Sequence, residues 1–219
     1  MDPLQQISST IALSMGTAWA SGLNLYATLL VLGVLGLTGD IILPENLQIL
    51  TNPLVMTGAG LMFITEFVAD KIPGVDSGWD AVHTFIRIPA GAILAAGAVG
   101  EVSPALSLTA GILGGGVTAG THATKAGTRA LINTSPEPFT NWAASISEEI
   151  AVVGGLWTAM NYPWVFIGFL VVFIGLVIWL LPKLWKGIKA VFRAIGRLFG
   201  AGNPQPSPGG GGQSGGQAP

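Results

Sequence analysis

The chain has no cysteine and little charge, and each deficit excludes classes of protein. Without cysteine there are no disulfides, thiolate metal ligands or thiol nucleophiles. With only two histidines a zinc site is not expected, and we predict no cofactor. Only 9% of the residues are charged, compared with about 25% in soluble domains. The net charge of −2 offers no basic field to nucleic acid, so no nucleic-acid partner is predicted.

Sequence patterns of common enzymes are also missing. Residues 1–200 contain no Walker loop, no G-x-S-x-G, no H-E-x-x-H and no Rossmann fingerprint. An intramembrane enzyme acting on lipid would need a nucleophile, and none is evident. We therefore predict that the protein is not an enzyme.

The chain is rich in long apolar stretches. Its residues are 50% hydrophobic and its mean hydropathy is +0.64. A helix needs about 20 apolar residues to cross a bilayer, so we predict an all-α, polytopic transmembrane helical bundle of about six spans. The expected spans cover about residues 7–37, 53–70, 81–100, 104–131, 141–160 and 163–181, with turn-forming Pro, Asn and Gly between them.

The Lys and Arg residues, nine in all, fall on one side of this six-span arrangement. Four lie in or near the loops of that side, and five follow residue 182. The opposite loops contain acids and no base. The positive-inside rule makes the base-rich side cytoplasmic. We therefore predict a multi-pass protein of the bacterial inner membrane with both termini in the cytoplasm.

The sequence divides into three regions. Residues 1–182 are the predicted transmembrane domain, and residues 183–200 are a basic amphipathic helix. The bases of that helix favour binding to anionic lipid headgroups, although a helix end that extends its lysines to the interface explains them at least as well. Residues 201–219 are rich in Gly, Pro, Ser and Gln and are predicted to be disordered.

Two further predictions concern how the spans are arranged. The first and last three spans carry acids in corresponding places, which favours a 3+3 inverted repeat. Small residues four apart, as in Ala12, Gly16 and Ala20, predict close helix packing. That packing can serve the bundle itself or a homo-oligomer, and the sequence leaves both open.

The strongest candidate site lies in residues 64–92, ITEFVADKIPGVDSGWDAVHTFIRIPAGA. Glu66 and Asp70 are four residues apart and share one helix face. Placing a carboxylate inside a membrane is energetically unfavourable, and carboxylates found there are usually functional. We therefore predict that Glu66 and Asp70 bind a cation or relay protons. Glu149 is a further acid in an apolar stretch. The ion-binding candidates are Glu66, Asp70, Glu149, Asn24, His83 and Arg87.

Other charged residues are predicted to support the structure. Two acids flank the turn that follows residue 72, and two bases near residue 127 are expected to be counter-ions or interfacial anchors. Glu148 follows Ser145 by three residues, which is the spacing of a capping box at a helix start. The structural candidates are Lys71, Asp76, Asp80, Glu148, Lys125 and Arg129.

Three stretches carry a family resemblance: ASGLNLYAT at 20–28, EFVADKIPGVDSGWD at 66–80 and RIPAGA at 87–92. They resemble the bacterial membrane-protein family catalogued as domain of unknown function 4126, over roughly residues 14–160. The resemblance implies a membrane location and no established activity. A weaker similarity links Glu66, Asp70 and Lys71 to divalent-cation/proton exchangers with the motif E-x-G-D-K-[ST]. Here the acids are one residue further apart and the glycine is missing.

Two functions remain open at this point. The first is a small secondary transporter or channel for a cation or proton, which uses the acidic residues at the cytoplasmic side. The second is a non-catalytic membrane scaffold that recruits lipid or partners through its basic C-terminal helix and tail. Replacing Glu66 by glutamine should affect only the first function, and deleting the chain after Pro182 should affect only the second.

Overall fold

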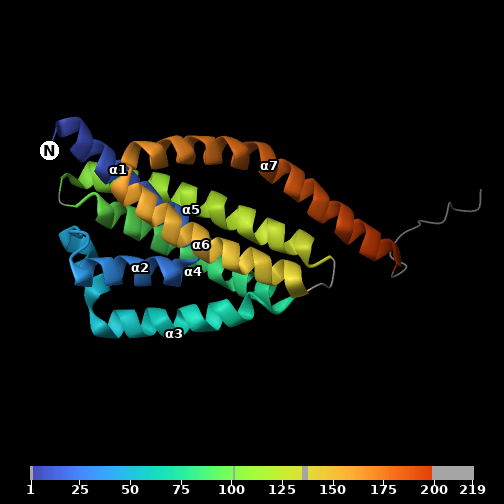
Figure 1. Ribbon diagram of the computed structural model, residues 1–219. Coiled ribbons are helices and arrows are strands. Elements are labelled where there is room, and N and C mark those ends of the chain that lie inside the picture. Colours follow the sequence, from blue (N-terminus) through green and yellow to red (C-terminus); the bar gives the residue numbers. More distant parts are fainter. Residues whose placement is uncertain (1, 101, 135–137, 199–219) are drawn as a thin grey trace, which may run out of the picture.

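The computed structural model describes residues 2–100, 102–134 and 138–198, and this part of the chain is helical without a strand. This confirms the predicted all-α class. The helices pack lengthwise into an elongated bundle (Figure 1). In chain order they are α1 (Pro3–Leu23), α2 (Leu25–Thr38), the 3₁₀ helix η1 (Glu45–Thr51), α3 (Pro53–Ala69), α4 (Val75–Ala98), α5 (Pro104–Ile132), α6 (Pro138–Asn161) and α7 (Pro163–Leu198).

Helix starts follow the turn chemistry of the sequence. Three helices begin with proline directly after a capping side chain, since proline lacks the N–H that a first turn leaves unbonded. Asp2, Asn52 and Ser103 each accept a hydrogen bond from a backbone N–H in the first turn of α1, α3 and α5 respectively. These caps place the starts of α3 and α5 where the sequence predicts them.

The first expected span, residues 7–37, is two helices instead of one. Asn24 has an extended backbone conformation and separates α1 from α2. Its side-chain oxygen accepts from Ala27 N–H at 2.9 Å, so Asn24 is the N-cap of α2. In Figure 1, α2 runs back toward the end of the bundle at which α1 starts. The two helices therefore form a hairpin whose tip, at Asn24, is buried.

The start of α1 and the end of α7 lie at opposite ends of the bundle (Figure 1). The first turns of α1 share a cavity with Val102 at the α4–α5 junction. A side chain at Gly97, near the end of α4, would meet Leu47 of η1. At the other end, Gly187 of α7 lies near Leu131 of α5. These two helix ends lie apart because α2 turns back instead of continuing α1. The sides of the membrane on which the termini lie stay a prediction.

Two helices are long and apolar enough to cross a membrane, namely Val75–Ala98 and Pro163–Gly187, and η1 with α3 forms a third such span if this bent pair counts as one. The other helices of the described residues do not meet the same standard, and among them α2 is apolar but too short. The described helices thus indicate a membrane protein. The number of six spans and the inverted repeat stay predictions.

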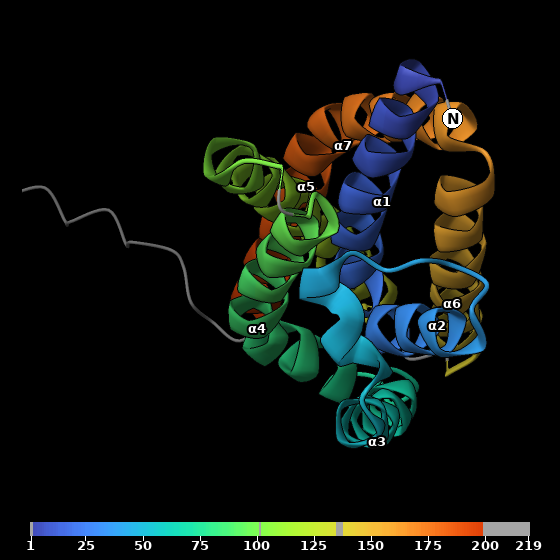
Figure 2. The same ribbon diagram turned by 90° about the vertical axis from the view of Figure 1, so that its left-hand side faces the viewer.

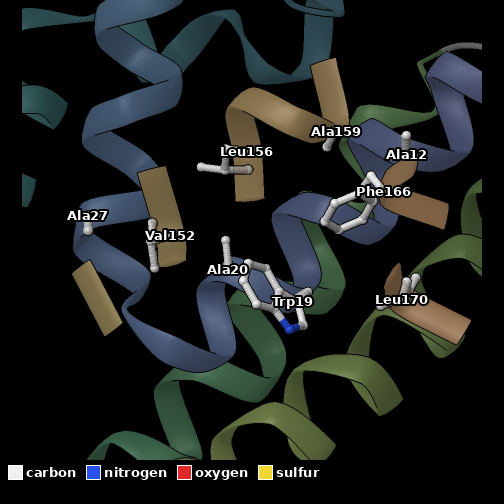
Figure 3. Close-up of a cluster of buried hydrophobic side chains, with 9 residues drawn as sticks. All are labelled: Ala12, Trp19, Ala20, Ala27, Val152, Leu156, Ala159, Phe166 and Leu170. Atoms are coloured by element: carbon white, nitrogen blue, oxygen red, sulfur yellow. The ribbon is translucent and has the colours of Figure 1, made fainter. Parts of the chain in front are cut away.

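Helix α1 lies inside the bundle, between α4 and α5 on one side and α6 on the other (Figure 2). Its Trp19 ring makes edge-on contacts with Phe166 and Phe169 of α7. Figure 3 shows Trp19 and Phe166 among small and aliphatic side chains of α1, α2, α6 and α7. The buried apolar cluster contains Ala12, Trp19, Ala20, Ala27, Val152, Leu156, Ala159, Phe166 and Leu170.

Glycine allows α5 to approach its neighbours closely. A β-carbon at Gly114 would lie 2.2 Å from that of Ala95 on α4 and 3.4 Å from that of Ala18 on α1. Two β-carbons do not approach to 2.2 Å in real proteins, so α4 and α5 would have to move apart. Gly116, two residues along the same helix, has no neighbour within 4 Å of such an atom.

We expect Gly114→Ala to lower the free energy of unfolding by about 1–3 kcal/mol, the usual effect of overpacking a tight interface. The matched Gly116→Ala should be neutral or slightly stabilising, since alanine favours helix by about 1 kcal/mol over glycine. Thermal unfolding of both variants in detergent measures the difference. Equal midpoints for the two would contradict the close α4–α5 packing.

Helix α7 has 36 residues and continues through Pro182 to Leu198. At about 1.5 Å per residue it is roughly 54 Å long, and the hydrocarbon core of a bilayer is only about 30 Å thick. The boundary predicted at residue 182 therefore falls inside a helix. The predicted tail, residues 201–219, lies outside the described residues.

Candidate functional site

Charged side chains gather in the interior of the bundle between α3, α4, α5 and α6. We call this set the charge cluster, and most of its members are fully buried. Several of them lie on helices that are far apart in the sequence. Its members are Glu66, Asp70, Asp76, Asp80, Arg87, Lys125, Arg129 and Glu148.

Lys125 lies at the centre of the charge cluster. Its ammonium nitrogen is 2.9 Å from Asp70 Oδ2 and 3.3 Å from Glu66 Oε1. The carboxylates of Glu148 and Asp80 follow at 3.3 and 3.8 Å. Thus one cation from α5 faces four carboxylates from three other helices. Such mutual pairing offsets the large penalty for burying each charge alone.

Arg87 forms the inner end of the charge cluster. Its guanidinium pairs with Glu66 through Nη2, and with Asp80 Oδ1 at 3.2 Å through Nη1. Because Arg87 is fully buried on α4 and Glu66 is fully buried on α3, this pair holds the α3–α4 hairpin together from inside.

Arg129 forms the outer end, one turn closer to the end of α5. It pairs with Glu148 Oε2 at 2.9 Å and donates to the carbonyl oxygen of Asp70 at 2.7 Å. Beyond it, Asn133 donates to both carboxylate oxygens of Asp76, at 2.7 and 2.9 Å. The charge cluster therefore continues from the bundle interior to the turn that follows α3.

One of the two histidines is held in a neutral form by its partners. His83 Nδ1 faces the carbonyl oxygen of Trp79 at 2.9 Å and therefore carries a proton, and its Nε2 lies 3.1 Å from the Tyr26 hydroxyl oxygen. His122 Nδ1 faces the Arg87 guanidinium at 3.2 Å, which only donates. Its proton therefore lies on Nε2, which is 3.1 Å from the Asp80 carbonyl oxygen.

The helix break at Asn24 meets the charge cluster. Asn24 Nδ2 donates to Glu149 Oε1 at 3.0 Å, and the carbonyl oxygen of Leu23 accepts from Lys125 Nζ at 3.1 Å. The carbonyl end of a helix carries partial negative charge and the N–H end partial positive charge. The C-terminal end of α1 thus faces a cation, and the N-cap of α2 binds a carboxylate.

Negative charge exceeds positive charge in this interior. Within the charge cluster, five carboxylates face three cations when all are ionised. Three buried carboxylate oxygens, Glu66 Oε2, Asp70 Oδ1 and Asp80 Oδ2, have no hydrogen-bond partner in the described residues. Buried acceptors of this kind are rare and destabilising.

The described residues contain no group of three His, Asp or Glu side chains arranged to hold a metal ion. Each acid of the charge cluster instead lies against a guanidinium or ammonium group. A divalent ion would have to displace that resident cation.

Lys71 lies next to the charge cluster, in the turn after α3. Its ammonium group donates to the Phe67 carbonyl oxygen at 3.0 Å and lies 3.4 Å from Ser145 Oγ. Burial lowers the pKa of Lys71, and the carboxylates of Glu149 and Asp70 oppose this shift.

The structure brings together some predicted site residues and separates others. Glu66, Asp70 and Arg87 meet in the charge cluster, whereas Glu149 pairs with Asn24 beside it. His83 lies to one side, stacked on Trp79. The residues assigned to structure, Lys71 apart, are in the charge cluster itself, so the two predicted groups are one network.

The expected capping box does not form. Helix α6 begins at Pro138, two turns before Ser145, so Ser145 and Glu148 lie inside the helix. Glu148 instead pairs with Arg129 and Lys125. Sequence reasoning also missed the Leu23 carbonyl and the central place of Lys125. The signal available for the free Leu23 carbonyl was Asn24, a strong N-cap residue inside an apolar run.

A cavity of about 470 Å³ lies elsewhere, between the first turns of α1 and the α4–α5 junction. Its walls are mostly apolar, with Ile11, Met15 and Leu113 among them. It does not include any member of the charge cluster.

These features define a helical membrane protein with apolar outer helices and a buried, ion-paired centre. The chain belongs to the family described as domain of unknown function (DUF4126), whose model matches residues 11–183. This confirms the family resemblance of the three sequence stretches. The match contains the whole charge cluster and ends where the basic segment of α7 begins. Neither the curated proteins nor the solved structures gave a significant match to the chain.

Proposed function

We propose that this protein is a small secondary transporter whose coupling ion, a proton or a monovalent cation, binds at the charge cluster. The observation that supports this most directly is the excess of two negative charges in a buried interior, together with three carboxylate oxygens that lack a partner. A purely structural network would pair such groups fully, since each unpartnered one destabilises the fold.

The broken helix supports the same function. Transporters of several folds place ion sites where a helix is interrupted inside the bundle, because the free helix ends offer backbone carbonyls and N–H groups there. Here the interruption at Asn24 supplies the Leu23 carbonyl to Lys125 and the Asn24 amide to Glu149.

We further propose an orientation in the bacterial inner membrane. The turn after α3, the end of α5 and the last part of α7 carry the bases, so the positive-inside rule makes this end cytoplasmic. The start of α1 then lies on the opposite side of the membrane, with the exposed Glu45. The charge cluster extends toward this end through Asp76, which accepts from Asn133.

The test is ion flux in proteoliposomes that contain a pH-sensitive dye. Wild-type protein should move protons or cations when a pH step or a salt gradient of KCl, NaCl or NH₄Cl is imposed. Glu66→Gln should abolish this flux, because the amide keeps the shape of the side chain and removes its charge. Glu45→Gln, an exposed acid at the other end, is the matched control and should transport normally.

Both variants should elute as folded protein. Glu45→Gln should unfold at the wild-type temperature, and Glu66→Gln at a lower one, because Arg87 and Lys125 lose one of their buried partners. Flux that is equal in Glu66→Gln and wild type would exclude the charge cluster as the ion site. Absence of flux in the wild type under all gradients would contradict transport itself.

A second function is favoured by the length of α7. The helix is longer than a bilayer requires. The exposed Lys183 lies over the ring of Trp179, with its nitrogen 2.9 Å from the ring centre. The exposed Lys189 lies over the ring of Trp185, at 5.0 Å. We propose that this segment binds anionic lipid headgroups. The same proteoliposomes separate the two functions. A chain ending at Lys183 should keep its flux if it is a transporter, and lose only its preference for anionic lipid.

A further inference from the structure

The oxygens around Lys125 surround its ammonium nitrogen on several sides. Besides the four carboxylates at 2.9, 3.3, 3.3 and 3.8 Å, the Leu23 carbonyl oxygen lies at 3.1 Å. Four of these oxygens are within 3.3 Å of the nitrogen. A lysine ammonium has only three N–H donors, so the surrounding acceptors outnumber what Lys125 can satisfy.

Further acceptors belong to the same walls. The unpartnered oxygens of Glu66, Asp70 and Asp80 each share a carboxylate group with an oxygen that faces Lys125. These residues are at least 99% buried, so water outside the bundle does not reach them. The carboxylates around the lysine nitrogen thus contain acceptor oxygens that no donor of the described residues fills.

The distances decide which cation fits. N–H···O bonds are about 2.7–3.2 Å long, close to the four short distances around Lys125. Calcium requires oxygens at about 2.3–2.6 Å and magnesium at about 2.0–2.1 Å. The site is therefore too wide for these divalent ions and matches ammonium or a monovalent ion of similar size.

Asn24 creates one of these ligands. In an unbroken helix the Leu23 carbonyl would accept from Ala27 N–H, four residues on. Here Ala27 N–H donates to the Asn24 side chain at 2.9 Å, which leaves the Leu23 carbonyl free for Lys125. The helix break thus leaves the Leu23 carbonyl oxygen available to the ammonium group of Lys125.

We propose that the oxygens around Lys125 are a binding site for an ammonium-sized monovalent cation, occupied in this structure by the tethered ammonium group of Lys125 itself. Lysine has a flexible four-carbon stem, so withdrawal of the side chain would empty the site for a free cation. The inference concerns the same charge cluster as the proposed transport, and names the class of ion that the cluster holds.

The test is to remove the tethered cation and supply a free one. Purified Lys125→Ala in detergent should unfold at a lower temperature than the wild type in choline chloride. Replacing choline by NH₄Cl or KCl at constant ionic strength should raise its midpoint saturably, by about 5 °C or more, as expected for a ligand that binds only the folded state. Wild type and Lys189→Ala, which loses an exposed lysine, should show no saturable response.

An equal response to choline and ammonium, or none at all, would overturn the site. If Lys125→Ala is not recovered folded, the double variant Lys125→Ala with Glu148→Gln has less unpaired charge and should fold with the same ammonium response. Failure of both variants to fold in ammonium also contradicts the site. Binding is measured without a membrane gradient, so binding without flux would refute transport alone, and flux without binding would refute this site alone.

Discussion

Replacing Arg87 by leucine is expected to lower the free energy of unfolding by about 3–5 kcal/mol, the effect of removing one partner from a buried ion pair. Arg87 is fully buried and holds Glu66 and Asp80. Leucine would fill much of the volume and leave both carboxylates against an apolar surface. The Nδ1 atom of His122 would lose its donor as well. Chemical denaturation in detergent measures the loss.

Two controls separate charge from packing in this result. Arg193→Leu removes an exposed arginine that bonds to a carbonyl of its own helix, and should change stability by less than about 0.5 kcal/mol. Adding Glu66→Gln to Arg87→Leu should restore part of the loss, because the orphaned charge is gone, with a coupling of about 0.5–3 kcal/mol. Arg87→Leu protein as stable as the wild type would show that these ion pairs do not hold α3 to α4.

Asn24→Ala is the second change with a large expected effect. It removes the N-cap of α2, returns Ala27 N–H to the Leu23 carbonyl and leaves Glu149 without its amide donor. Loss of a cap is about 1 kcal/mol, and a buried acceptor without a partner adds about 1–3 kcal/mol. We expect a total near 2–4 kcal/mol and loss of ion flux, because Lys125 would lose its backbone ligand.

The chain contains a matched control for Asn24. Asn52 is also an asparagine N-cap, accepting from Leu54 N–H at 2.9 Å, but it lies exposed at the start of α3 and far from the charge cluster. Asn52→Ala should lose about 1 kcal/mol, the value of the cap alone, and keep its flux. Equal effects of the two substitutions on flux would mean that the helix break serves only to cap α2.

Local chemistry in the sequence was enough to find most helices. Proline after Asn52 and Ser103 marks two starts, and the spacing of Glu66 and Asp70 places both on one face of α3. The break at Asn24 was not predicted, because Gly22 and Asn24 lie in an otherwise apolar run that is long enough to span a bilayer as one helix. What separates the two helices is the buried partner of Asn24, the Glu149 carboxylate on α6, which is 125 residues away in the chain.

The charge cluster shows the same limit. In the sequence Lys125 and Arg129 could be counter-ions or interfacial anchors, since both lie near the end of an apolar stretch. In the structure both point inward, because acids from α3, α4 and α6 meet there. Which face of a helix is buried depends on the helices that surround it, and a single sequence does not state which helices these are.

The ion pairs also suggest an order of assembly for the growing chain. Glu66 and Arg87 pair within the α3–α4 hairpin, and Arg129 and Glu148 pair within the α5–α6 hairpin. Each hairpin can therefore enter the bilayer with part of its charge already neutralised, which matters because an unpaired charge opposes insertion by about 2.5–3.5 kcal/mol. Lys125 is the residue that joins the two hairpins, since its ammonium group reaches acids of both. The ion pairs of Lys125 with acids of both hairpins would thus form last, when the two separately inserted hairpins pack together.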